Sequence, residues 1–282
     1  MSKIAILTDS TAYLHKDFVE IHNIRVISLK IHWDEANFED GVDIFPSEFY
    51  ERLAKSSTLP TTSQPPVDEF LKVYEELAAD YDGIIVPLIS SGISGTVSSA
   101  KTAASMFSKI PIEVIDTHST ASGLALVDIA VAQAIAEGKD LAEIKTLAEA
   151  IIQRLDLFFA VDTLKYLHKG GRIGGASRYF GTALRIKPIL YLDNEGKIDA
   201  LERVRTKSKA MAKLVQLTTD KAVGKPVHVG IIHAGAFDEA KKLQGQLQSQ
   251  LDCKQAEIYE ISPVIGTHVG PGTVGVAVYT EE

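Results

Sequence analysis

Residues 83–96 read Gly-Ile-Ile-Val-Pro-Leu-Ile-Ser-Ser-Gly-Ile-Ser-Gly-Thr, and this stretch decides the fold. Its first half, residues 83–89, is a short apolar run with the composition of a buried strand. Its second half is polar and rich in glycine, and it leads directly into a helix pattern over residues 96–107. A buried strand that turns into a helix in this way is typical of a parallel sheet covered by helices.

The same alternation continues on both sides of this stretch. Strand patterns occur over residues 3–8, 25–32 and 112–115, and helix patterns occur over residues 67–79 and 124–137. Parallel sheets of this kind bind ligands in the crevice at the carboxyl ends of their strands. We therefore predict an N-terminal α/β domain with a parallel sheet over residues 1–158.

A second region begins at the apolar run of residues 157–161. Strand patterns over 186–192 and 197–204 flank the turn residues Asp193–Gly196, which indicates a hairpin. A helix over 207–218, a strand over 227–232, a helix over 238–251 and two final strands are expected after it. We predict a C-terminal α/β domain over residues 159–282. No linker rich in proline, glycine or serine separates the halves, so we expect the two domains to pack firmly.

Composition excludes several classes of protein. The net charge of −8 argues against binding to nucleic acid and against a polybasic attachment to anionic lipid, although transient membrane contact stays open. The one cysteine, Cys253, excludes an intramolecular disulfide and a multi-cysteine metal site. No signal-peptide pattern and no membrane-spanning apolar run is present, so we expect a cytoplasmic protein.

The loop after the strand of residues 83–89 is a candidate anion site. Gly92 and Gly95 allow close approach of a ligand to the backbone, and Ser94 is expected near the cap of the following helix. The Ser94 hydroxyl could cap the helix or bind a ligand, and we favour the ligand. A role for Ser94 as a hydrolase nucleophile is weakly supported, because the last glycine of the G-x-S-x-G pattern is misplaced.

Three further polar segments are ambiguous when taken singly. Residues 59–66 contain Thr62 and Ser63 and are typical of a capped helix start, although their hydroxyls exceed what capping needs. The glycine-rich loop of residues 267–272 places His268 where a ligand could approach. The basic loop of residues 168–175 and the alternating pair Arg203 and Arg205 could be solvated surface or a docking site for a phosphate or an acidic partner.

Taken together, these loops resemble the DegV family, which includes the fatty-acid-binding subunits of bacterial fatty acid kinase. The matching segments are Thr8-Asp9-Ser10-Thr11, Thr62-Ser63-Gln64-Pro65, the loop of residues 90–96, residues 161–173, Lys187-Pro188-Ile189-Leu190 and His268-Val269-Gly270-Pro271-Gly272. They occur in order over most of the chain.

The resemblance implies two packed α/β domains with a tunnel between or beneath them that encloses a long-chain fatty acid. It implies that Thr62 and Ser94 hold the carboxylate, with Ser63, Gly95 and His268 as neighbours. The protein would be a carrier with no catalytic residue, metal or cofactor of its own.

The resemblance also implies a partner, a separate kinase subunit that phosphorylates the carboxylate with ATP. Arg172, and more weakly Arg203 and Arg205, would dock this kinase subunit. Two alternatives stay open: a lipid hydrolase that uses Ser94, and a carrier or sensor of another apolar carboxylate with no kinase partner.

Overall fold

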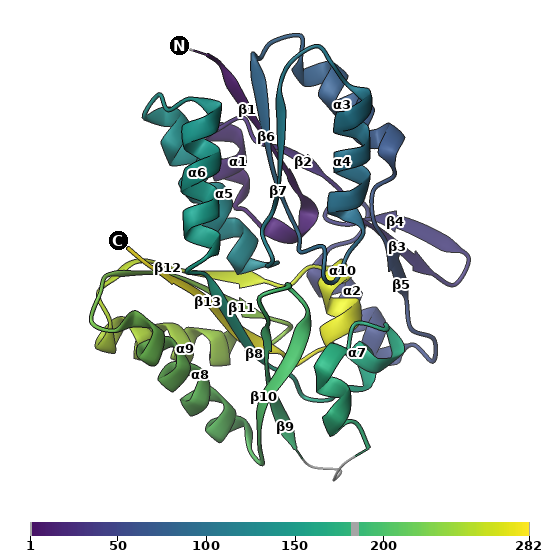
Figure 1. Ribbon diagram of the computed structural model, residues 1–282. Coiled ribbons are helices and arrows are strands. Elements are labelled where there is room, and N and C mark those ends of the chain that lie inside the picture. The colour runs from purple at the N-terminus through teal and green to yellow at the C-terminus, as the bar shows by residue number, and fades with distance from the viewer. Residues whose placement is uncertain (1, 182–185, 282) are drawn as a thin grey trace.

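The structure is a computed structural model that describes residues 2–181 and 186–281. The described chain forms a four-stranded sheet, a six-stranded sheet and a small three-stranded sheet (Figure 1). Helix α5 (Ser122–Ala136) packs against strands of both larger sheets. This helix is apolar on nearly all sides, as expected for a helix enclosed in a core.

The four-stranded sheet is parallel, which confirms the predicted fold class. Its strands, in spatial order, are β2 (Arg25–Ile27), β1 (Ile4–Asp9), β6 (Gly83–Leu88) and β7 (Ile112–Asp116). Because side chains alternate along a strand, Ile85 packs toward one face, with α1 (Lys16–Ile21), α5 and α6 (Leu141–Ile152). Ile84 and Val86 pack toward the other face, with α3 (Val67–Leu77) and α4 (Thr96–Met106).

The prediction of a single strand over residues 25–32 is wrong. The segment divides into β2, at the edge of the parallel sheet, and β3 (Lys30–Trp33), which belongs to the three-stranded sheet. In that sheet β3 pairs antiparallel with β4 (Ala36–Glu39) and with β5 (Thr61–Ser63), and α2 (Pro46–Lys55) lies between β4 and β5 in the chain. The segment around Thr62 and Ser63, expected to be a helix start, is therefore a strand.

The six-stranded sheet is mixed. Its strands, in spatial order, are β10 (Ile198–Val204), β9 (Lys187–Leu192), β8 (Asp156–Ala160), β13 (Val274–Thr280), β11 (Val227–His233) and β12 (Cys253–Glu260). Helices α8 (Lys207–Ala222) and α9 (Phe237–Gln250) cover one face, and the other face joins the core that contains α5. The boundary expected near residue 158 falls inside β8, and the division into domains 1–158 and 159–282 stays a prediction.

Several short helices lie at one side of the six-stranded sheet (Figure 1). They are α7 (Lys165–Lys169), α10 (Pro263–Val269) and the 3₁₀ helix of residues Gly174–Tyr179; a further 3₁₀ turn, Ser10–Ala12, follows β1. In the described part of the chain, no helix has the length and apolar character needed to cross a membrane.

Candidate ligand-binding site

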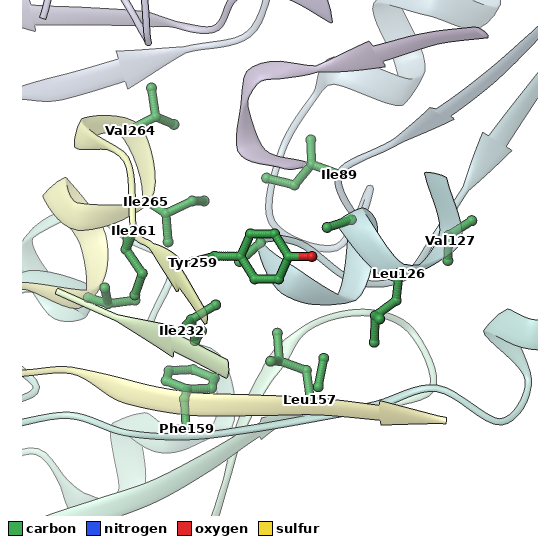
Figure 2. Close-up of a cluster of buried hydrophobic side chains, with 14 of the residues drawn as sticks. Ile89, Leu126, Val127, Leu157, Phe159, Ile232, Tyr259, Ile261, Val264 and Ile265 are labelled. Atoms are coloured by element: carbon green, nitrogen blue, oxygen red, sulfur yellow. The ribbon is translucent and has the colours of Figure 1, made fainter. Parts of the chain in front are cut away.

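A largely apolar cavity lies between the carboxyl end of the parallel sheet and the six-stranded sheet. Figure 2 shows several of its apolar side chains: Ile89 after β6, Leu157 and Phe159 from β8, Ile232 from β11, Ile261 after β12, and Val264 and Ile265 from α10. The polar lining includes Thr62, Ser63, Ser94 and His268, which the sequence had already singled out.

Thr62 and His268 form the polar contact at the mouth of this cavity. Thr62 Oγ1 lies 2.8 Å from His268 Nε2. Thr62 is held by β5, and His268 lies in the last turn of α10 rather than in the predicted loop. The sequence does carry start signals for this helix, because Ser262 occupies the cap position and Pro263 the first turn.

His268 is buried, with 9% of its surface exposed, and this burial determines its charge. Burial and the positive charge of Arg172 lower the pKa of His268 to about 4, so the ring is neutral near pH 7. Its Nδ1 has no hydrogen-bond partner within residues 2–181 and 186–281. If Nε2–H donates to Thr62 Oγ1, the Thr62 hydroxyl proton is free to donate to a ligand oxygen.

Ser94 lies at the start of α4, one residue before its cap Gly95. Its hydroxyl lies 2.8 Å from Thr96 Oγ1 and accepts a bond from the Thr96 backbone N–H at 3.3 Å. The helix therefore begins beside the cavity, and a helix N-terminus favours a negatively charged ligand group nearby. Because His268 bonds to Thr62 and Ser94 bonds to Thr96, the described contacts give Ser94 no base, which weakens the hydrolase hypothesis.

The two remaining predicted neighbours have different surroundings. The Ser63 hydroxyl lies 2.9 Å from His32 Nε2, so it has a partner outside the cavity. Gly95 is absent from the residues that line the cavity, and a Cβ at this position would lie 2.8 Å from the amide nitrogen of Gln64. Gly95 therefore makes room for Gln64, which does line the cavity.

Arg172 lies in the wall between the cavity and an outer basin. Thr62, Arg172 and His268 line both spaces, whereas Lys169 lines only the outer basin. The Arg172 guanidinium donates to the carbonyl oxygens of Ile93, at 3.2 Å, and Gly170, at 2.8 Å. Arg172 thus steadies the loop that carries Ser94 and makes the outer side of the mouth cationic.

Arg203 and Arg205 lie elsewhere. Arg203 is exposed on β10, with its guanidinium 5.6 Å from the centre of the Tyr179 ring. Arg205 is exposed just after the end of β10. Neither residue lines the cavity or the outer basin.

The turn between β7 and α5 was not predicted to belong to the site. Thr120 and Ala121 line the cavity and are buried, and Ala121 has φ 55° and ψ −132°. This turn lies at a strand carboxyl end, just as the loop of residues 90–96 does, so the same reasoning would have found it. Its run of four polar residues, 117–120, was the available signal.

In the described part of the chain, no group of three or more histidine, cysteine, aspartate or glutamate side chains is arranged to hold a metal ion. The polar atoms of the cavity are hydroxyls, an amide, an imidazole and one guanidinium. These groups are hydrogen-bond donors or can act as donors, which suits a ligand with an anionic or acceptor group at one end.

The fold and the site define a class: α/β proteins with an apolar cavity enclosed between two sheets and a hydroxyl-rich mouth at a helix N-terminus. The family model described as "Uncharacterised protein, DegV family COG1307" matches residues 3–281. The chain belongs to the DegV family, as the resemblance in its loops implied.

Individual relatives agree over nearly their whole length. Protein DegV of Bacillus subtilis is 37% identical over 278 residues, which cover 97% of this chain and 98% of that protein. Its crystal structure, described as that of a fatty acid binding protein, has a TM-score of 0.92 at 34% identity and covers both chains fully. A DegV family protein from Thermus thermophilus, whose structure is described by its fatty acid binding, has a TM-score of 0.94 at 32% identity over 99% of this chain and 100% of that one.

Proposed function

We propose that this protein binds one long-chain fatty acid in the cavity, with its carboxylate at Thr62, Ser94 and His268. The observation that carries this proposal is a largely apolar cavity whose lining includes the polar side chains of Thr62, Ser94 and His268. The fatty acid binding of the Bacillus subtilis and Thermus thermophilus relatives supports it.

The chemistry of the mouth suits a carboxylate. The Thr62 hydroxyl would donate to one oxygen, with His268 Nε2–H supporting it from behind. The Ser94 hydroxyl and the start of α4 would donate to the other oxygen. A carboxylate at a helix N-terminus is stabilised by about 0.3–1 kcal/mol when exposed, and by up to about 2 kcal/mol when partly buried.

Most of the affinity would come from the acyl chain. Each buried methylene contributes about 0.8 kcal/mol, so a chain of roughly 16 carbons gains on the order of 10 kcal/mol before the cost of association is subtracted. The polar mouth would therefore fix the orientation and chemical class of the ligand, and the apolar walls would fix affinity and chain preference.

We further propose that the protein is a carrier rather than an enzyme and that it presents the carboxylate to a separate ATP-dependent fatty acid kinase subunit. A carboxylate oxygen would attack the γ-phosphorus of ATP, which gives an acyl phosphate and ADP. The outer basin, with Arg172 and Lys169 in its lining, would receive the new phosphate. Because the kinase reaction uses ATP, this role places the protein in the cytoplasm.

The first experiment is mass spectrometry of the purified protein under native conditions and again after organic extraction. We expect one equivalent of a long-chain fatty acid to remain bound through purification. A mass equal to that of the bare polypeptide, with no uptake of added fatty acid, would contradict the proposal. Stoichiometric release of a different apolar carboxylate would favour the alternative of another ligand.

Docking is tested with Arg203 and Arg205, because Arg172 also supports the binding loop. The double variant Arg203→Ala and Arg205→Ala should bind fatty acid normally but be phosphorylated more slowly by the kinase subunit of the same organism. Arg25→Ala is the matched control, since Arg25 is an exposed arginine paired with Glu76 on the parallel-sheet side. Equal phosphorylation of all three proteins would exclude Arg203 and Arg205 from docking.

A further inference from the structure

Thr120 places a polar group in the apolar wall of the cavity. Its side chain lines the cavity, only 6% of the residue is exposed, and its Oγ1 has no hydrogen-bond partner in the described ranges 2–181 and 186–281. The other cavity hydroxyls differ, because those of Thr62, Ser63 and Ser94 bond to side chains and that of Thr273 to backbone carbonyls. A buried hydroxyl without a partner is unfavourable and calls for a specific explanation.

The backbone of this turn is fixed in place from several sides. The Ser119 carbonyl accepts the Ser90 N–H at 2.7 Å, and the Thr117 hydroxyl donates to the Leu88 carbonyl at 2.8 Å. Asp116 Oδ1 accepts the His118 N–H at 3.1 Å. The backbone of the turn is therefore held in place, and Thr120 stays in the lining of the cavity.

The start of α5 adds to the polarity of this position. Its cap residue, Ala121, provides no side-chain hydrogen bond, and Ala121 itself lines the cavity. This helix is 15 residues long, and the positive end of its dipole lies at the same place as the Thr120 hydroxyl. An acceptor oxygen at this point would receive a bond from Thr120 and be favoured by the helix.

We propose that Thr120 is a specificity-determining residue for an acyl chain that carries a hydroxyl or keto oxygen. This inference rests on the proposed binding of a long-chain fatty acid. The carboxylate stays at the mouth with Thr62 and Ser94, and the chain oxygen forms a second, separate polar contact with Thr120 in an otherwise apolar wall.

The experiment is a competition between stearic acid and a series of hydroxystearic acids whose hydroxyl is moved along the chain. Delipidated protein is incubated with equal amounts of stearic acid and one isomer, and the bound ratio is read by mass spectrometry after extraction. The ratio is measured for wild type, Thr120→Val and Thr120→Ser. Thr102→Val, an exposed helical threonine on α4, is the matched control for the change of side chain.

We expect the isomers with the hydroxyl in one part of the chain to compete best against stearic acid for the wild-type protein. Thr120→Val should lower the ratio of hydroxystearic to stearic acid for those isomers by about 5- to 30-fold, because the chain oxygen then lacks its partner. Thr120→Ser should keep the wild-type ratio, and Thr102→Val should not change it. Thr120→Val should also bind stearic acid at least as tightly as wild type does, which shows that the variant is folded.

Two different failures are distinguishable. Equal ratios for wild type and Thr120→Val with every isomer, while both proteins bind stearic acid, would overturn the role of Thr120 and leave the proposed function intact. Binding of neither acid by wild type would overturn the proposed function, and the inference with it.

Discussion

Thr62 and His268 are 206 positions apart in the chain, yet Thr62 Oγ1 and His268 Nε2 are 2.8 Å apart at the mouth of the cavity. The contact joins a strand of the three-stranded sheet to the short helix that precedes the last strand. It places a neutral imidazole behind a hydroxyl, so that the hydroxyl proton can point at a ligand.

Thr62→Val keeps the shape of the side chain and removes this bond. We expect fatty acid affinity to fall about 10-fold, because the ligand then lacks the Thr62 hydroxyl as a donor and the His268 ring no longer supports that donor. The unfolding free energy should fall by about 1–2 kcal/mol, since His268 Nε2 is left buried without a partner. Binding is measured by titration after delipidation, and stability by urea unfolding.

Thr61→Val is the control for that variant. Thr61 precedes Thr62 on β5 but is exposed and does not line the cavity. Equal affinities for Thr61→Val and Thr62→Val would contradict a direct role for the Thr62 hydroxyl.

Local periodicity in the sequence places Ser94, whereas only the family resemblance pointed to Thr62 and His268, and the difference has a physical reason. Ser94 follows a long apolar strand and opens a helix, so local periodicity places it at the carboxyl end of a parallel sheet. Thr62 lies on a three-residue strand and His268 on a seven-residue helix. Elements this short have too few residues for a period to emerge, and they form because long-range packing holds them.

The same distinction holds for the fold. The helices over residues 67–77 and 96–106 were predicted to within two residues of their ends, because each has an apolar face of several turns. The division of residues 25–33 between two sheets was not predicted, because Leu29 and the residues around it form one continuous strand pattern. Only the tertiary partners of Lys30–Trp33, which are β4 and β5, show that the strand changes sheet.

The low pKa of His268 makes stability depend on pH. The unfolded chain takes up a proton near pH 6.5, whereas burial and Arg172 delay protonation of the folded chain to about 4. The stability associated with the neutral ring is therefore fully present above pH 6.5 and is lost as the pH falls toward 4. At about 1.4 kcal/mol per unit of pKa, the loss approaches about 3 kcal/mol.

We expect His268→Gln to remove this dependence. The difference in unfolding free energy between wild type and variant should be larger at pH 7.5 than at pH 4.5, with wild type losing its advantage in acid. Urea unfolding at both pH values gives this difference. A difference that stays constant between the two pH values would mean that the ring titrates normally in the folded chain.

Asp40 has the opposite dependence. It is buried, and its carboxylate accepts bonds from the Ser10 and Ser262 hydroxyls, both at 2.8 Å, and from the Val264 N–H at 3.3 Å. Burial raises the pKa of Asp40 to about 7. Because the folded chain holds this proton more tightly than the unfolded chain, the associated stability is present below pH 3.8 and is lost as the pH rises through 7.

Asp40→Asn is neutral at every pH and should therefore gain stability relative to wild type as the pH rises from 5 to 8, by about 2–3 kcal/mol. Urea unfolding of both proteins at pH 5, 6.5 and 8 measures this change. If the two proteins differ by the same amount at all three values, Asp40 is charged throughout and its pKa is not raised. Ser262 and Val264 belong to the start of α10, so the variant also tests whether Asp40 anchors the helix that carries His268.

Gly92 and Gly95 form a matched pair that tests how the two larger sheets meet at the site. A Cβ at Gly92 would lie 2.5 Å from the Glu195 carbonyl oxygen and 2.6 Å from the Gly196 backbone, in the turn between β9 and β10. Ser90 Oγ donates to the Gly196 carbonyl at 2.9 Å across the same contact. A Cβ at Gly95 would instead meet the end of the flexible Gln64 side chain, which can move.

Gly92→Ala should therefore destabilise the protein by about 1–3 kcal/mol or more, because backbone on both sides must separate. Gly95→Ala should change stability by less than about 1 kcal/mol but alter the polar mouth through Gln64. Thermal unfolding separates the first effect, and fatty acid titration the second. Equal loss of stability in both variants would contradict close backbone contact at Gly92, and the turn of residues 195–196 would then not support the loop that carries Ser94.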